Sequence, residues 1–270
     1  MANTLKRTHF YSAEGNALGG TITRPHNQIV ASQANASLPE TGGFVSSVGQ
    51  AFHHDKLISC SGSYCHVAGG VNPKSGGYTT LVTSVVEGLN ILDIVTADRV
   101  VARISSEHPA VGYTPKVTLV GSNFINLRIA GFPVEAVLNF DLLNPPNQYP
   151  ESPWLRNAAF LETIRQQYRS RAKSAVAQEI EQQSGWIESD EGIEQRGYIV
   201  CSLVDRIAGR FPGESSGNLV VVPEVGRFYF GELIVDQGTF TLSMIRAELG
   251  SPIGAAFSGP IGSTNGHTYP

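Results

Sequence analysis

The amino-acid sequence predicts a mainly β protein, an antiparallel β-sandwich or a related two-sheet fold, that carries one long α-helix. Charged residues make up only 16% of the 270 residues and glycine occurs 29 times, a composition typical of many short strands joined by tight turns. Residues 79–106 are rich in β-branched side chains and alternate between apolar and polar positions, which is the period of a half-buried strand. Only residues 152–183 show the three- and four-residue spacing of an amphipathic helix. We expect residues 1–270 to form a single domain.

The amino-terminal part is predicted to begin with a strand pair. Residues 8–30 contain two short apolar runs around a glycine-rich bend at residues 15–20, where glycine permits a tight turn. Residues 31–49 are small and polar, and they are expected to form an extended loop or an edge segment.

Residues 79–106 are predicted to be the centre of the core. They form two or three consecutive antiparallel strands, with tight connections expected at Gly88-Leu89-Asn90 and at Ala97-Asp98. A further hairpin is expected from residue 115 onward. The side chains predicted to be buried are Val86, Ile91, Val100 and Ile104.

The helix predicted over residues 152–183 is an insertion between strands. Ser152 is a suitable N-cap, Pro153 suits the first helical position, and Ser184-Gly185 is a suitable stop. Its arginines and Lys173 make the outer face basic. Residues 186–196 are acidic and are expected to form a loop or hairpin that could pair with this basic face.

The last third of the sequence returns to strands up to residue 249. Residues 251–270 are rich in glycine and proline, and they are predicted to form an extended tail on the surface of this chain or of a neighbouring copy.

Residues 50–70 hold the greatest density of side chains that can bind a metal. The candidate ligands are His53, His54, Cys60, Cys65 and His66. A zinc site would need four such donors, but no close CxxC pair is present, and adjacent residues of a strand point to opposite faces. A local disulfide between the two cysteines is an alternative. The preferred interpretation is a structural strand pair with no metal, cofactor or catalytic group.

Several classes of function are disfavoured by the composition. The formal net charge of −4 gives no electrostatic footprint for nucleic acid, and no apolar run is long enough to cross a bilayer. Three cysteines are too few for a disulfide scaffold. No apolar run near the amino terminus suits a signal-peptide core, which points to the cytoplasm if taken at face value.

A set of short motifs resembles the "choice-of-anchor" class of bacterial surface β-domains. They are Leu38-Pro39 followed by Gly42-Gly43, Gly88-Leu89-Asn90-Ile91, the run from Val95 to Val100, and Gly121 before a strand. The resemblance covers residues 38–140 and part of the carboxy-terminal strands. It implies a β-rich, non-enzymatic, extracellular module. The chain departs from that class in having no evident anchor or export signal and in its helix.

The expected function is a non-enzymatic structural or adhesive one, as a self-associating subunit of a surface, filament or shell. No acid, base, nucleophile and cofactor loop occur together, whereas many strand edges favour association by strand addition. One alternative is a carbohydrate-binding sandwich that uses exposed Tyr11, Tyr64, Tyr78 and Trp186. The other is a metal-assisted enzyme built on residues 53–66, with Asp55 or His108 as general base.

Overall fold

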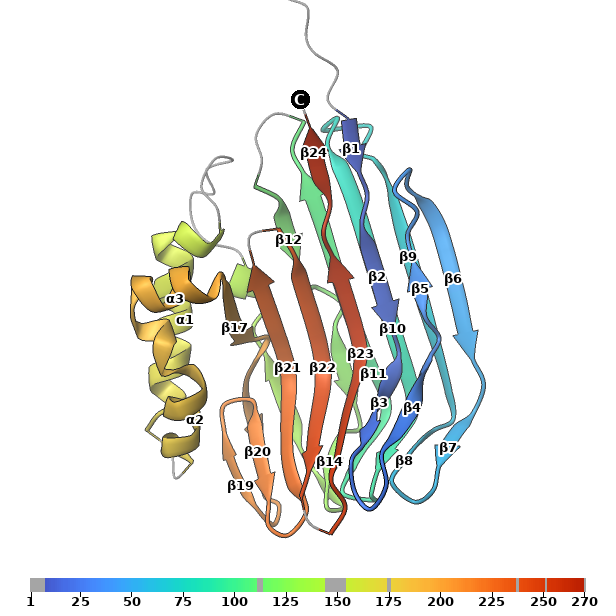
Figure 1. The fold of residues 1–270 in the computed structure, drawn as a ribbon, viewed down its shortest axis with the longest axis vertical. Helices are drawn as coiled ribbons and strands as arrows, with labels where there is room; N and C mark the ends of the chain where they lie inside the picture. The colour runs from blue at the N-terminus through green and yellow to red at the C-terminus, as the bar shows by residue number, and fades with distance from the viewer. Residues whose placement is uncertain are drawn as a thin grey trace, which may run out of the picture.

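Two antiparallel sheets lie face to face, and a group of helices packs beside one of them (Figure 1). The computed structural model describes residues 8–110, 114–143, 154–173, 176–236, 238–250 and 252–269. The predicted mainly β, two-sheet architecture is confirmed.

The front sheet, nearest the viewer in Figure 1, is formed mostly by the carboxy-terminal half of the chain. Its strands in spatial order are β19 (Glu214–Ser216), β20 (Leu219–Val222), β21 (Gly226–Asp236), β22 (Phe240–Leu249), β23 (Ala255–Thr264), β2 (Ala13–Asn16) and β5 (Ala36–Ser37). Three more strands join it: β17 (Tyr198–Ser202) pairs with β21, β3 (Leu18–Ile22) with β23, and β4 (Gln28–Gln33) with β3.

The back sheet is built around one long hairpin. Its strands in spatial order are β15 (Phe132–Pro133), β14 (Arg128–Ile129), β11 (Val95–His108), β10 (Tyr78–Ile91), β8 (Ile58–Cys60) and β7 (Phe52–His54). Strand β9 (Gly62–Val71) lies along β10, β6 (Gly43–Gly49) along β9, and β12 (Lys116–Thr118) and β13 (Asn123–Ile125) along β11. Two small pairs, β1 (Thr8–Phe10) with β24 (His267–Tyr269) and β16 (Glu135–Leu138) with β18 (Val204–Ala208), complete the strands.

The central hairpin joins β10 and β11, each 14 residues long. It turns at Leu92 and Asp93, which both have positive φ, and Asn90 holds the turn because its Oδ1 accepts the Asp93 amide at 2.8 Å. The connections predicted at residues 88–90 and 97–98 are therefore wrong, because both lie inside strands. Asparagine and aspartate tolerate turn conformations that other residues avoid, and here they outweigh Gly88 as the turn signal.

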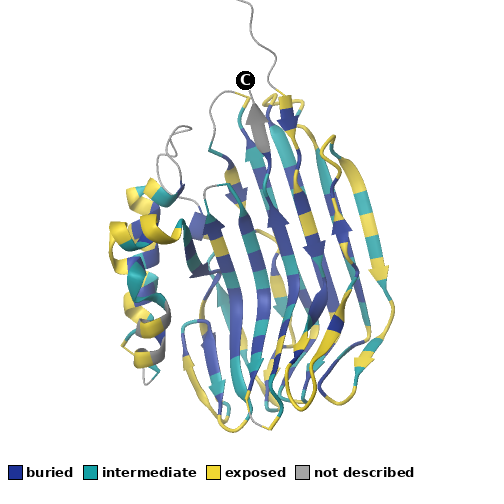
Figure 2. Ribbon diagram, viewed as in Figure 1, coloured by how far each residue is buried: buried dark blue, intermediate teal, exposed yellow. Residues whose placement is uncertain are grey.

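The core lies between the two sheets, where β22 and β23 cross β10 and β11. The four residues predicted to be buried there are at most 1% exposed, so that prediction is confirmed. Buried and exposed positions alternate along the long strands, which is the pattern of a sheet with one face on the core (Figure 2).

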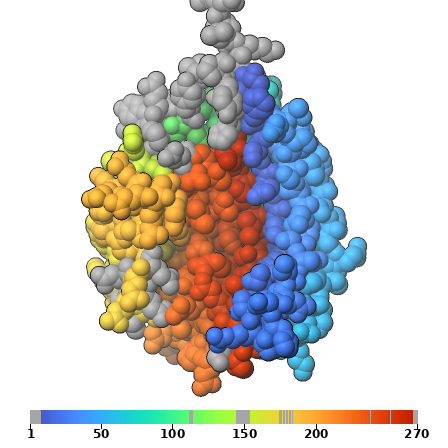
Figure 3. Space-filling view, viewed as in Figure 1, coloured from blue at the N-terminus to red at the C-terminus, as the bar shows by residue number. Residues whose placement is uncertain are grey.

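The prediction of an extended tail at residues 251–270 is wrong. Residues 255–264 form β23, which pairs with β22 on one side and with β2 and β3 on the other, so amino- and carboxy-terminal segments lie side by side (Figure 3). The segment is poor in large apolar side chains because the sheets approach closely here. A Cβ added to Gly262 would stand 3.0 Å from Ile104 Cγ2.

The helical insertion consists of α1 (Ala158–Arg171) and α2 (Ala177–Ser184), preceded by the 3-10 turns η1 (Phe140–Leu143) and η2 (Trp154–Arg156). The N-cap of α1 is Asn157, whose Oδ1 accepts the Phe160 amide at 3.1 Å; Ser152 and Pro153 lie outside the described residues. None of the helices in the described ranges is long and apolar enough to cross a membrane.

The acidic segment after α2 is helical, so the predicted loop or hairpin is wrong. It forms the 3-10 turn η3 (Gly185–Glu188) and α3 (Asp190–Arg196), with Ser189 as N-cap and Gly197 as the left-handed C-cap. Asp190 and Glu191 in the first turn favour this helix electrostatically. The expected pairing with the basic helix is confirmed: Asp190 lies 2.5 Å from Arg165, and Glu188 lies 2.7 Å from Arg169.

Candidate functional site

The predicted metal ligands lie on strands β7 to β9 but do not converge. Cys65 points into the core and accepts a hydrogen bond from Ser84 Oγ at 3.2 Å, whereas His66, its neighbour on the strand, points to the outer face. Cys60 and Cys65 are free and buried, and burial raises the pKa of both thiols. Within the ranges that the structure describes, no three His, Cys, Asp or Glu side chains are grouped so as to hold a metal ion.

Of the two general bases proposed for a metal-assisted enzyme, Asp55 lies beside one candidate ligand and His108 lies elsewhere. The Asp55 side chain is 80% exposed at the turn between β7 and β8, and its carboxylate lies 3.9 Å from His54 Nε2. His108 is buried at the end of β11, where its ring lies 4.9 Å from that of His9. Among the described residues, the His54–Asp55 contact is not joined by a third His, Cys, Asp or Glu side chain that would complete a metal site.

The aromatic residues proposed for carbohydrate binding are divided among three places. Tyr11 is buried against His9, so its predicted exposure is wrong, and its ring lies 6.2 Å from that of Tyr78. Trp186 packs on Tyr198 beside the helices. Of these four residues, Tyr64 alone lies on the outer face of the back sheet.

That outer face contains a broad hollow of about 730 Å³, which we call the arginine hollow. Alternate positions of five strands line it, because every second residue of a strand points to the same face. Its residues are Val48, Tyr64, His66, Thr83, Arg99, Val101, Arg103, Gly121, Asn123 and Ile125. The strand register places Tyr64, Val85 and Val101 in one row, and His66, Thr83 and Arg103 in the next.

The arginine hollow is positively charged. Arg99 Nη2 donates a hydrogen bond to the Tyr64 hydroxyl, and its guanidinium carbon lies 5.9 Å from the centre of the Tyr64 ring. None of the described residues that line the hollow carries a carboxylate. Glu87 is the cross-strand neighbour of Arg99, but its carboxylate extends over Gly62, and neither Arg99 nor Arg103 forms an ion pair with any described residue.

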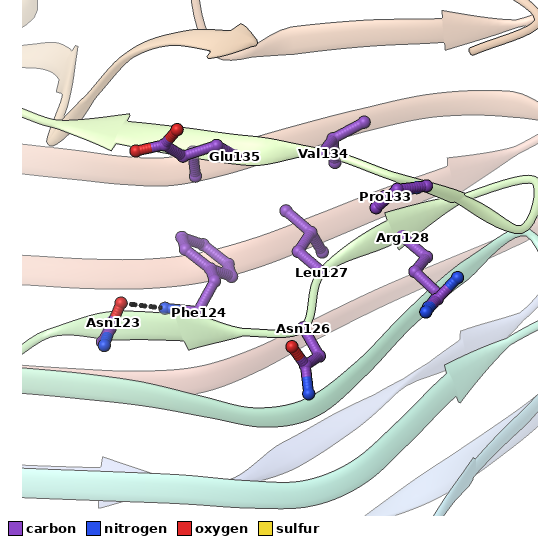
Figure 4. A pocket seen from close by; sticks show the side chains of 9 residues that line it. Asn123, Phe124, Asn126, Leu127, Arg128, Pro133, Val134 and Glu135 are labelled. Carbon is purple, nitrogen blue, oxygen red and sulfur yellow. Dashed lines mark hydrogen bonds between the residues drawn. The ribbon is translucent and has the colours of Figure 1, made fainter. Parts of the chain in front are cut away.

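A second hollow, of about 320 Å³, lies between β13 and β16 (Figure 4). Phe124, Leu127 and Val134 line its apolar part, and Asn123 Oδ1 accepts the Phe124 amide at 2.8 Å. It contains both Arg128 and Glu135, so its charge is balanced, unlike that of the arginine hollow.

The front sheet carries a comparable arginine in a different setting. Arg246 lies 3.8 Å from the centre of the Tyr229 ring, and donates to both carboxylate oxygens of Glu232 at 2.7 and 2.9 Å and to Glu248. Burial alone would lower the pKa of Arg246, but its hydrogen bonds to Glu232 and the nearby negative charges outweigh burial and hold that pKa above its usual range.

The helices cover a second polar group beside this network. Arg171, at the end of α1, lies against Gly217 and near Cys201, and burial lowers the Arg171 pKa to about 10. Burial also raises the pKa of the Cys201 thiol to about 12. Arg171, Cys201 and Tyr229 all line one small cavity of about 50 Å³.

One free edge of the back sheet is β6. Among the described strands it pairs only with β9, and its sequence from Gly43 to Gly49 contains no charged residue. Phe44 is 66% exposed and Val48 is 70% exposed, both on the outer face.

Sequence reasoning missed Phe44, Val48, Arg99 and Arg103 as surface features. The signal was present, since Arg99, Val101 and Arg103 occupy alternate positions of a predicted strand and therefore share a face. What the sequence did not show is which strands lie beside β11 and whether an acidic residue neutralises the arginines.

A family model described as a domain of unknown function (DUF8256) matches residues 9–236. No curated protein matches the chain. No solved structure matches it either.

Proposed function

The chain belongs to the DUF8256 family, whose function is unknown. For this chain we propose a non-enzymatic role as a self-associating structural subunit whose copies join through β6. The observation that carries this proposal is the exposed, uncharged edge of the back sheet. An edge strand offers unpaired backbone N–H and C=O groups, and soluble proteins usually protect such edges with charges, prolines or bulges. Strand β6 has none of these protections between Gly43 and Gly49.

The sequence of β6 is nearly self-complementary. In an antiparallel pairing of two copies centred on Ser46, Phe44 lies opposite Val48 of the partner subunit, and the two glycines at the strand ends lie opposite each other. Each apolar cross-strand pair contributes roughly 0.2–1 kcal/mol beyond the backbone hydrogen bonds. The resulting two-fold contact would join two back sheets into one continuous sheet, the form of association expected for an isologous dimer.

The resemblance to bacterial surface domains supports the same class of function. We propose an extracellular surface as the place of this assembly, because that resemblance implies a non-enzymatic surface module. Localising the protein in its native cells by surface labelling tests this part, and labelling confined to lysed cells would reject it.

The assembly is tested by placing a charge on the proposed two-fold axis. Ser46 is exposed in the single chain, so Ser46→Lys is harmless to the monomer but sets two lysines opposite each other in the dimer. We expect the wild type to have twice the chain mass of 28.9 kDa by sedimentation, and Ser46→Lys to be monomeric. The matched control is Thr21→Lys, an exposed position on β3, which is paired on both sides.

A mixture of Ser46→Lys and Ser46→Glu chains provides the complementary result. Each variant alone should be monomeric, whereas the mixture should recover the dimer because opposite charges then meet on the axis. A wild type that stays monomeric at several hundred micromolar, or a dimer that tolerates Ser46→Lys, would show that β6 is not the contact.

A further inference from the structure

We propose that the arginine hollow binds an acidic saccharide, a carbohydrate whose sugar units carry carboxylates. This site lies on the outer face of the back sheet and does not depend on the association of β6 edges. Its ligand class follows from three features of the lining: two arginines without carboxylate partners, a group of aromatic rings, and backbone groups already occupied.

The two arginines point to an anionic ligand. Arg99 and Arg103 are four residues apart on β11 and share its outer face, which separates their Cα atoms by about 13 Å. Arg99 Nε is buried and has no acceptor among the described residues. A guanidinium binds a carboxylate through two parallel hydrogen bonds, which makes arginine the usual residue for planar anions. Uncompensated positive charge on a chain of net charge −4 marks this face as distinct from the rest of the surface.

The aromatic rings point to a ligand with a flat apolar face. The ring centres of Tyr64 and His66 lie 5.1 Å apart, and Phe44 stacks on His66 at 5.8 Å. A pyranose ring has one such face, formed by its C–H groups, and its hydroxyls need partners at the rim. Thr83 and Asn123 supply a hydroxyl and an amide there. Binding sites typically combine an apolar surface with a few polar groups of this kind.

The backbone argues against a peptide as occupant of the hollow. Peptides that add to sheets do so by main-chain hydrogen bonds, which need a free edge. Strands β9, β10 and β11 each have neighbours on both sides along the hollow. The part of the face over these three strands therefore offers side chains only, and a ligand that is recognised through carboxylates, hydroxyls and ring faces fits it best.

The test measures binding of defined oligosaccharides to the wild-type chain by calorimetry. The probes are oligomers of galacturonate, mannuronate and guluronate, with a neutral galactose oligomer of the same length as the uncharged control. We expect at least one acidic oligomer to bind, the neutral one to bind at least tenfold more weakly, and affinity to fall as salt screens the charges.

Two variants and a control locate the site. Arg103→Gln should weaken binding more than tenfold, and Tyr64→Leu should weaken it without changing the charge of the protein. Arg128→Gln should bind as the wild type does, since Arg128 is exposed on the same sheet but outside the arginine hollow.

Three results would overturn the proposal. They are absence of binding to all three acidic oligomers at millimolar concentration, binding that Arg103→Gln leaves unchanged, and equal binding of poly-glutamate, which would indicate a general anion surface. The sedimentation experiment on β6 is independent of all three, so failure of one proposal leaves the other standing.

Discussion

The outer faces of the two sheets each hold an arginine next to a tyrosine, and they differ in what surrounds that pair. On the front sheet Arg246 lies on Tyr229 and is held by Glu232 and Glu248. On the back sheet Arg99 bonds Tyr64, and Arg103 lies nearby, without an ion pair to any described residue. The same residue types therefore form a closed structural network on one face and an open, charged surface on the other.

The surroundings of the two tyrosines explain the difference. Tyr229 packs with Tyr168 of α1 and Ile180 of α2, so the arginine beside it is partly withdrawn from water and needs its charge balanced. None of the described helices lines the open hollow that contains Tyr64. An arginine that is partly buried beside helices thus needs a carboxylate partner, whereas an arginine on an open face can keep its N–H donors available to a ligand.

The largest effect is expected from Arg246→Ala. The Glu232 side chain is only 13% exposed, so removal of Arg246 leaves a mostly buried carboxylate without its bidentate partner. We expect the free energy of unfolding, measured by denaturant titration, to fall by about 2–3 kcal/mol, the cost of leaving a mostly buried acceptor unsatisfied. A loss no larger than that of a surface substitution would show that the Arg246 network contributes no more to stability than the unpaired arginines of the back sheet.

The next effect, smaller when it is expressed per unit of pH, is expected from the pH dependence of Cys201. The unfolded thiol ionises near pH 8.5, whereas the folded thiol keeps its proton up to about pH 12. The folded state therefore binds more protons in this window, and stability falls by up to about 1.4 kcal/mol per pH unit as pH rises through it. Below about pH 8.5 the thiol keeps its proton in both the folded and the unfolded state, so none of this stability is lost there. The comparison is with Cys201→Ala, whose stability should decline less steeply between pH 9 and 11; identical slopes would contradict the burial of this thiol.

The smallest effect is expected from Arg103→Ala. Because Arg103 is exposed and has no ion pair among the described residues, unfolding free energy should change by less than about 0.5 kcal/mol. Thermal or denaturant unfolding measures this directly. A change as large as that of Arg246→Ala would mean that the back face is also a structural network, and the comparison of the two faces would fail.

The sequence was sufficient for the fold class and for the core of the central hairpin. Strand alternation predicted the burial of Val86 and Val100 because it depends only on local periodicity. The role of residues 255–264 was missed since small residues such as Gly262 look like a tail unless the sheet opposite them is known. The single-domain organisation and the absence of a metal site remain predictions.

The candidate surfaces were less predictable than the core. Exposure of Phe44 depends on β6 having no neighbour beyond β9, and the charge of the hollow depends on Glu87 extending away from Arg99. Both are properties of pairing between distant segments, which local patterns do not encode. The caps of α3 were easier to predict from the sequence. Ser189 is a good N-cap before acidic residues, and Gly197 is a good C-cap, so together they indicate a helix.

The position of β23 constrains when the molecule can complete its fold. Strands β2 and β3 have β23 as a partner, although about 230 residues separate β3 from β23 along the chain. At a synthesis rate of 5–20 residues per second, a nascent chain takes roughly 10–50 s to cover that distance. The β10–β11 hairpin is complete at His108, so for about 7–30 s of that time it can form from its own neighbours while the inner face of the back sheet lacks its central cover. Chaperone contact during synthesis is therefore expected to concentrate on the back sheet and to end when β23 emerges.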